Sequence, residues 1–125
     1  MVKAGLAAIL GAALVMALAW SGVPLALGAH PFWAVKVGYF GVGAGLLAVA
    51  LLAAIGLRAR MLGVMGLLSM IVAGAIASEG KARFAASYGD DLVAGRMWFF
   101  GWIAICAALF VVAFALFRAV LVARR

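Results

Sequence analysis

The sequence contains very few of the residues from which catalytic sites, metal sites and polar pores are built. It has three carboxylates, one histidine, one cysteine and two prolines in 125 residues, and neither asparagine nor glutamine occurs. The single cysteine, Cys106, forms no disulfide within the chain and makes no metal-binding pattern. No residues have the spacing of a zinc site or of a nucleophile with its base. We therefore expect no catalytic residue, no bound metal and a role other than that of an enzyme.

Apolar residues, by contrast, are abundant and occur in long runs. They make up 71% of the chain, whereas ordinary globular proteins are about half apolar. Apolar runs of about 20 residues are typical of helices that cross a bilayer. The predicted spans are residues 6–27, 37–57, 61–78 and 97–122. The sequence therefore predicts an all-α integral membrane protein with a single membrane domain, residues 1–125.

The connections between these runs predict the architecture. Lys3 and the apolar run behind it resemble a signal peptide, but the run is longer than a usual signal core, so we expect it to be the first span. Pro24 is expected to end or kink that helix. The short turn 58–60 predicts that the second and third spans form a hairpin. Gly80 is expected to end the third helix, with a short interfacial helix over 81–88 before the fourth. The predicted fold is a four-helix antiparallel bundle with this interfacial helix between the third and fourth spans.

Small residues in the spans predict close helix packing. The pair Gly41 and Gly45 forms a G-x-x-x-G pattern on the second span, and Gly66 and Gly74 lie on the third. Small side chains let membrane helices approach closely, where no hydrophobic effect drives them together. These four glycines are therefore candidate packing residues. Their neighbour is either another helix of this chain or a helix of another subunit.

Segment 79–97 contains every carboxylate of the chain, together with Lys81, Arg83 and Arg96. Asp90 or Asp91 is well placed to cap the N-terminus of the fourth helix. The alternative is a cation or proton site. Two adjacent aspartates supply few of the six to eight oxygens that calcium requires, so we expect the capping role.

The only histidine, His30, lies in the connection 28–36 and precedes Pro31, which favours a turn. We expect an interfacial side chain and no cofactor. The alternative is a ligand role at a haem, a pigment or a quinone, or a proton-accepting role, against which the position of His30 in a loop argues.

The basic residues predict the orientation. Six lie at the termini and in the turn 58–60, packed into short segments, and four lie on the other side, mostly in its longest loop. Dense lysine and arginine mark the cytoplasmic side. We expect a multi-pass protein of the bacterial inner membrane with both termini cytoplasmic. The formal net charge of +7 then reflects topology and anionic headgroups, and no nucleic acid is expected as a partner.

Tryptophan and tyrosine gather at the opposite ends of the spans, which predicts either a one-sided interfacial anchor or a surface for docking a partner. The candidate docking residues are Trp33, Phe84, Tyr88, Trp98 and Trp102. The expected partners are the lipid bilayer and other membrane subunits or further copies of this chain. We expect a non-catalytic accessory or structural subunit of a respiratory, photosynthetic or transport complex. The alternative is a small homo-oligomeric transporter or channel with its pore between subunits, and a third possibility is a pigment- or quinone-binding protein.

Overall fold

The computed structural model of the chain describes residues 1–124, and every regular element in that range is a helix. The helices are α1 (Val2–Trp20), α2 (Val23–Ala26), α3 (Lys36–Ala54), α4 (Ala59–Ala86) and α5 (Leu92–Ala123). All except the one-turn α2 are long and apolar enough to cross a membrane, which confirms the prediction of an all-helical chain with four candidate spans. α5 has 32 residues, or about 48 Å of helix, more than the ~30 Å hydrocarbon core of a bilayer.

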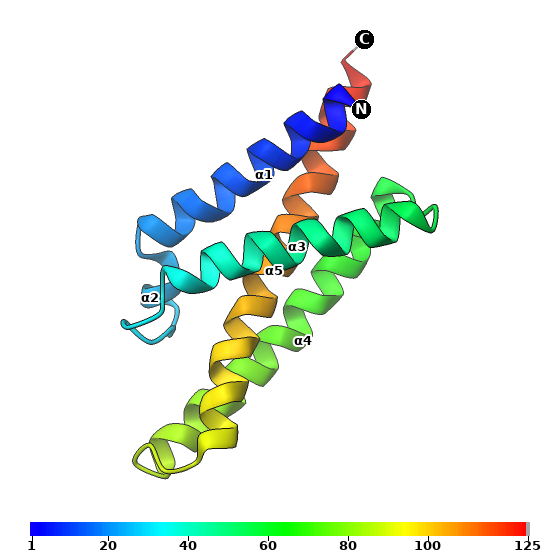
Figure 1. Cartoon of the computed structure of the whole chain (residues 1–125). Helices are drawn as coiled ribbons and strands as arrows, with labels where there is room; N and C mark the ends of the chain where they lie inside the picture. Colours follow the sequence, from blue (N-terminus) through cyan, green and yellow to red (C-terminus); the bar gives the residue numbers. More distant parts are fainter. Residues whose placement is uncertain (125) are drawn as a thin grey trace.

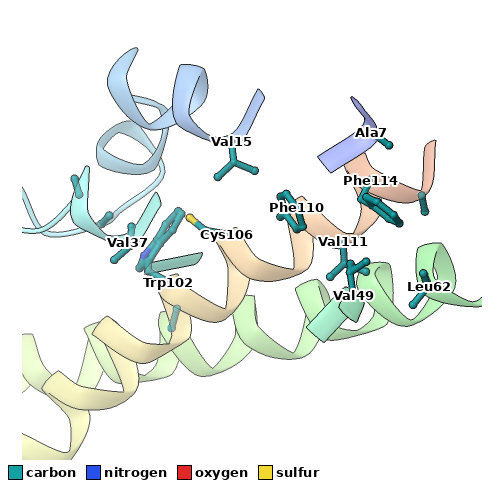
Figure 2. Packing of buried hydrophobic residues seen from close by; sticks show 14 of the residues in the cluster. Ala7, Val15, Val37, Val49, Leu62, Trp102, Cys106, Phe110, Val111 and Phe114 are labelled. Carbon is teal, nitrogen blue, oxygen red and sulfur yellow. The ribbon is translucent and has the colours of Figure 1, made fainter. Parts of the chain in front are cut away.

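α5 is the helix on which the other three long helices pack (Figure 1). α4 contacts it most extensively, and α3 and α1 pack on other parts of its surface. Figure 2 shows Phe110 and Phe114 projecting from α5 toward the α1 residues Val15 and Ala7. Phe110 is the largest of the fully buried side chains. The core is therefore a set of interfaces along one helix rather than a space enclosed equally by four.

The seam between α4 and α5 is made of small residues seven positions apart. Buried small residues lie at Gly66, Ala73 and Gly80 of α4, and at Ala94, Gly101, Ala108 and Ala115 of α5. Gly80 adjoins Ala94, and Gly66 adjoins Ala108, so the order along the two helices is reversed. A seven-residue repeat of small side chains keeps one stripe of each helix against its partner over a long distance.

The short turn between α3 and α4 was expected to form an antiparallel hairpin of these two helices, and they pack little on each other. The two helices diverge from the turn and make little contact with each other (Figure 1). A short connection reverses the direction of the chain, but the packing faces decide which helices touch. Gly41 and Gly45 of α3 pack against α5, and so does Gly66 of α4. The packed hairpin is the next one along the chain, formed by α4 and α5.

The separate interfacial helix expected over 81–88 is absent from the described residues, because α4 continues without a break to Ala86. Gly80 does not end the helix. A Cβ at that position would lie 2.5 Å from the backbone nitrogen of Trp98 and 2.7 Å from the Ala94 carbonyl oxygen, so the glycine permits close packing on α5. The chain instead reverses at Tyr88 and Gly89, which have positive φ angles of 54° and 86°.

The first helix ends at Trp20, earlier than the predicted boundary at residue 27. Gly22 takes a left-handed conformation with a φ angle of 87°, and Pro24 then lies in the first turn of α2. Proline is well accepted at this place because its missing N–H would have no helical partner there. Pro24 therefore starts a short helix after the break and does not kink α1.

The two ends of the molecule differ in charge. One end, here called the terminal end, holds both termini (Figure 1) and the α3–α4 turn. The basic residues of this end are Lys3, Arg58, Arg60, Arg118 and Arg124; Arg125 was predicted with them and lies outside the described residues. The other end, here called the loop end, holds the α4–α5 turn and all three carboxylates.

Candidate functional site

Five ring side chains from three segments form a cluster at the loop end. This loop-end cluster consists of His30, Trp33, Phe84, Trp98 and Phe99. Trp98 lies at its centre, with ring centroids 5.2 Å from Trp33, 5.5 Å from His30 and 5.8 Å from Phe84. Trp33 also meets Phe99 edge to face at 5.2 Å. Rings at these separations attract one another beyond the effect of burying their surface.

Trp98 also fixes the connection between α2 and α3. Its Nε1–H donates a hydrogen bond of 3.0 Å to the carbonyl oxygen of Gly28. The Lys81 ammonium lies 5.9 Å from the Trp98 ring centroid, within the range of a cation–π contact. Trp98 is only 9% exposed. Trp98 therefore joins α5, α4 and the connecting loop in one packed unit.

The predicted docking residues divide into three groups by exposure. Trp98 and Trp102 are buried inside the chain, with exposed fractions of 9% and 7%. Phe84 and Trp33 are half-buried within the loop-end cluster. Tyr88 is 97% exposed on the α4–α5 turn. Of the five, Tyr88 has the surface most available to a partner.

His30 is the exposed member of this cluster. Its Nδ1 accepts a hydrogen bond of 3.0 Å from the backbone N–H of Phe32, and its ring stacks on Trp33 with centroids 6.0 Å apart. A metal or pigment at this place would therefore coordinate through Nε2. Within residues 1–124, no three histidine, cysteine, aspartate or glutamate side chains lie close enough together to hold a metal ion.

Asp91 is the N-cap of α5, as the capping interpretation of the aspartate pair predicted. Its Oδ1 accepts a hydrogen bond of 3.0 Å from the Ala94 N–H, and its Oδ2 lies 3.3 Å from Arg83 Nη2. The Ser87 hydroxyl accepts a bond of 2.9 Å from the Asp91 N–H. The Ala94 N–H, with a smaller contribution from Arg83, lowers the pKa of Asp91, while partial desolvation opposes the shift. Asp90 is exposed beside it.

Three of the four predicted packing glycines lie where no side chain fits. A Cβ on Gly41 would overlap the Cys106 Cβ, one on Gly45 would lie 2.7 Å from Phe110 Cδ1, and one on Gly66 would lie 2.7 Å from Val112 Cγ2. All three approach α5. Gly74 differs, because no atom of the chain lies within 4 Å of its Cβ position.

Two glycines of the α4–α5 seam, Gly80 and Gly101, were not among the predicted packing residues. A Cβ on Gly101 would lie 2.8 Å from the Ala77 Cβ. The seven-residue spacing of small residues in both helices is the signal that identifies them. Gly74 lies eight residues after Gly66, one more than the seven-residue repeat that continues at Ala73, so it falls beside the seam and not in it.

An exposed pair of aromatic side chains lies on α1 and α3. Trp20 ends α1, and its Nε1–H donates a hydrogen bond of 3.2 Å to the Tyr39 hydroxyl. Phe40 is exposed next to this pair, and Gly43 follows on the same exposed face of α3 with no atom of the chain within 4 Å of its Cβ position. These residues form an apolar face that the chain itself leaves uncovered.

A cavity of about 270 Å³ lies between the connecting loop and the α4–α5 pair. Trp98, Trp102 and Gly74 form its apolar walls, and Lys81 and Ser78 contribute its polar groups. This volume is slightly below the range of about 300–1,000 Å³ that small-molecule sites usually have.

No family model matches the chain, and no curated protein and no solved structure is significantly similar to it.

Proposed function

We propose that this protein is a non-catalytic accessory subunit of a larger membrane complex, of the respiratory, photosynthetic or transport type. It inserts in the bacterial inner membrane as four antiparallel spans with both termini cytoplasmic. The dense basic residues of the terminal end support this orientation. The occupant of its uncovered face is a transmembrane helix of another subunit.

The exposed face of α3 is the observation that carries this proposal. Gly43 lies in the middle of that helix and packs against nothing in the chain, although glycine destabilises a helix interior by about 0.5–1 kcal/mol relative to alanine. Tyr39 and Phe40 adjoin it, one turn toward the loop end. A small residue beside exposed rings favours the close approach of a second helix, with the rings packing around it.

The loop end offers a second contact through Tyr88, which the α4–α5 turn holds away from the core. Phe84 supports that turn from inside, because its ring lies 3.5 Å from the Cβ position of Gly89 and packs on Trp98. In the proposed complex, the nearby charges Arg83 and Asp91 set the register with the partner, because charge complementarity contributes mainly to specificity.

The test compares two glycines of the same helix that face opposite ways. Gly41→Leu places a side chain against Cys106 and is expected to prevent folding, whereas Gly43→Leu is expected to leave the fold intact and abolish partner recovery. An affinity-tagged chain is purified in mild detergent from membranes of the organism in which it occurs. Co-purifying subunits are then identified by mass spectrometry, and Tyr88→Ala is measured alongside.

The outcomes separate the candidate functions. Foreign subunits that are recovered with the wild type, but lost with a folded Gly43→Leu variant, support the proposal. A homogeneous oligomer of this chain alone favours the alternative of a transporter or channel with its pore between subunits. A coloured or quinone-bearing preparation favours a ligand role near His30. Unchanged recovery with Gly43→Leu and Tyr88→Ala contradicts both proposed contacts.

A further inference from the structure

A cavity of about 560 Å³ lies at the terminal end, where all four long helices meet. Residues of α1, α3, α4 and α5 all contribute to its lining. Its walls include the apolar side chains of Leu57, Leu62 and Phe114. Cavities of this size commonly hold small molecules or lipid chains.

Three arginines line the same cavity. Arg58 ends the α3–α4 turn, Arg60 lies in the first turn of α4, and Arg118 lies one turn beyond Phe114 on α5. Arg118 is half-buried, whereas Arg58 and Arg60 are exposed. The basic groups thus lie near the mouth, and the apolar walls extend from them toward the middle of the molecule.

No carboxylate side chain of the sequence lies near this cavity. All three are in segment 79–91, at the other end of α4. Glu79 and Arg58 are separated by about 30 Å of helix, several times the Debye length of about 8 Å at physiological ionic strength. The electrostatic potential at the mouth of the cavity is therefore positive.

We propose that this cavity binds an anionic phospholipid. Arginine presents a planar fork of donors that matches phosphate oxygens, and basic pockets between membrane helices bind acidic headgroups. The headgroup phosphate contacts Arg58, Arg60 and Arg118, and an acyl chain lies along Leu62 and Phe114. The apolar walls distinguish this site from one for a soluble anion, which would gain nothing from them.

The inference rests on the proposed insertion in a membrane but not on the proposed partner. A negative result here leaves the Gly43→Leu test of partner recovery unaffected. A loss of partner recovery likewise says nothing about lipid affinity, because Gly43 is not one of the residues that line the cavity.

The test measures binding to the purified whole chain in detergent micelles by native mass spectrometry. Phosphatidylglycerol and phosphatidylcholine with identical acyl chains are compared with sn-glycerol 3-phosphate, which has the phosphate without the chains. Each basic residue near an anionic headgroup contributes roughly a fivefold gain in affinity, so we expect phosphatidylglycerol to bind at least about tenfold more tightly than phosphatidylcholine. Glycerol phosphate should not compete.

Two matched pairs of variants locate the site. Arg58→Gln with Arg118→Gln should weaken phosphatidylglycerol binding by roughly 25-fold, whereas Lys3→Gln with Arg124→Gln removes two charges from the same end outside the lining and should change it far less. Ala53→Trp fills the cavity and should abolish binding, and Ala50→Trp, three residues away on α3, should not. Circular dichroism confirms that each variant is folded.

Equal binding of the two phospholipids would overturn the proposal, as would equal losses in the two charge variants. Competition by glycerol phosphate would replace the lipid with a soluble phosphate ligand. Should the arginine variants fail to fold, the two tryptophan variants decide the matter, because equal binding by Ala53→Trp and Ala50→Trp would show that the cavity holds no lipid.

Discussion

Gly45→Ala should destabilise the packing of α3 on α5, whereas Gly43→Ala, on the opposite face of the same helix, should not. At Gly45 the added Cβ would lie 2.7 Å from Phe110 Cδ1 and 2.8 Å from the Ala107 carbonyl oxygen. At Gly43 it would meet no atom within 4 Å. The two variants therefore compare the same added methyl group at a packed position and at an open position of one helix.

The size of the effect follows from the backbone contact. Ordinary contacts of a Cβ begin at 3.4 Å, so the oxygen of Ala107, at 2.8 Å, has to move by the difference of 0.6 Å. That oxygen belongs to a helix backbone, so α3 and α5 have to separate. Overpacking of this kind costs about 1–3 kcal/mol, and replacing glycine by alanine in a helix returns about 0.5–1 kcal/mol. We expect Gly45→Ala to lower the free energy of unfolding by about 1–2 kcal/mol and Gly43→Ala to raise it by up to about 1 kcal/mol.

The assay is reversible unfolding in mixed micelles of dodecylmaltoside and an increasing fraction of dodecyl sulfate, followed by tryptophan fluorescence. Both variants are compared with the wild type in the same detergent, because micelle composition affects all three equally. If Gly45→Ala is as stable as Gly43→Ala, α3 does not approach α5 as closely as described, and the arrangement around α5 is wrong.

Three further predictions concern the loop end and the orientation. Phe84→Ala should lower the free energy of unfolding by about 1–2 kcal/mol, less than a fully buried phenylalanine, while Tyr88→Ala leaves it unchanged; equal effects in the same assay would contradict the packing of Phe84 on Trp98. Because the Ala94 N–H and Arg83 lower the pKa of Asp91, its contribution to stability is complete above the ordinary aspartate pKa and is lost as the pH falls through the lowered value. Asp91→Asn should therefore be less stable at neutral pH and lose less stability below about pH 4 than the wild type, and parallel pH profiles would refute this. In a Cys106→Ala background, a membrane-impermeant thiol reagent should label a cysteine at Ala86 from outside and one at Ala123 only after permeabilisation; the reverse pattern would invert the orientation.

The helices themselves were predictable because each depends on residues that are local in the sequence. A long apolar run is sufficient to indicate a span, and an aspartate before such a run is sufficient to indicate its cap, as Asp91 shows. The close packing of Gly41 and Gly45 was also predictable, since a pair of small residues one turn apart has few other uses in a membrane helix.

The partners of the helices were not predictable in the same way. Gly80 illustrates the difficulty, because the same residue type ends helices and permits close packing, and only the approach of the α5 backbone at Ala94 and Trp98 decides between the two roles. Trp98 and Trp102 are buried because other segments of the chain cover them, whereas their positions at the end of a span would also suit exposed aromatic residues at the membrane interface. The seven-residue repeat of small residues carried the information about the α4–α5 seam, but it emerges only when both helices are compared.

The central position of α5 has a consequence for biosynthesis. The three long helices that pack on it are all made before it, and of these α3 and α4 make little contact with each other. Each can insert as a separate hydrogen-bonded helix, because a bilayer requires only that its backbone be satisfied. At about 5–20 residues per second, the ribosome then needs several seconds to supply the last helix. During that interval the main contact among the inserted helices is that of α1 with α3, so a chain interrupted before α5 would be inserted in the membrane and yet lack most of its tertiary structure.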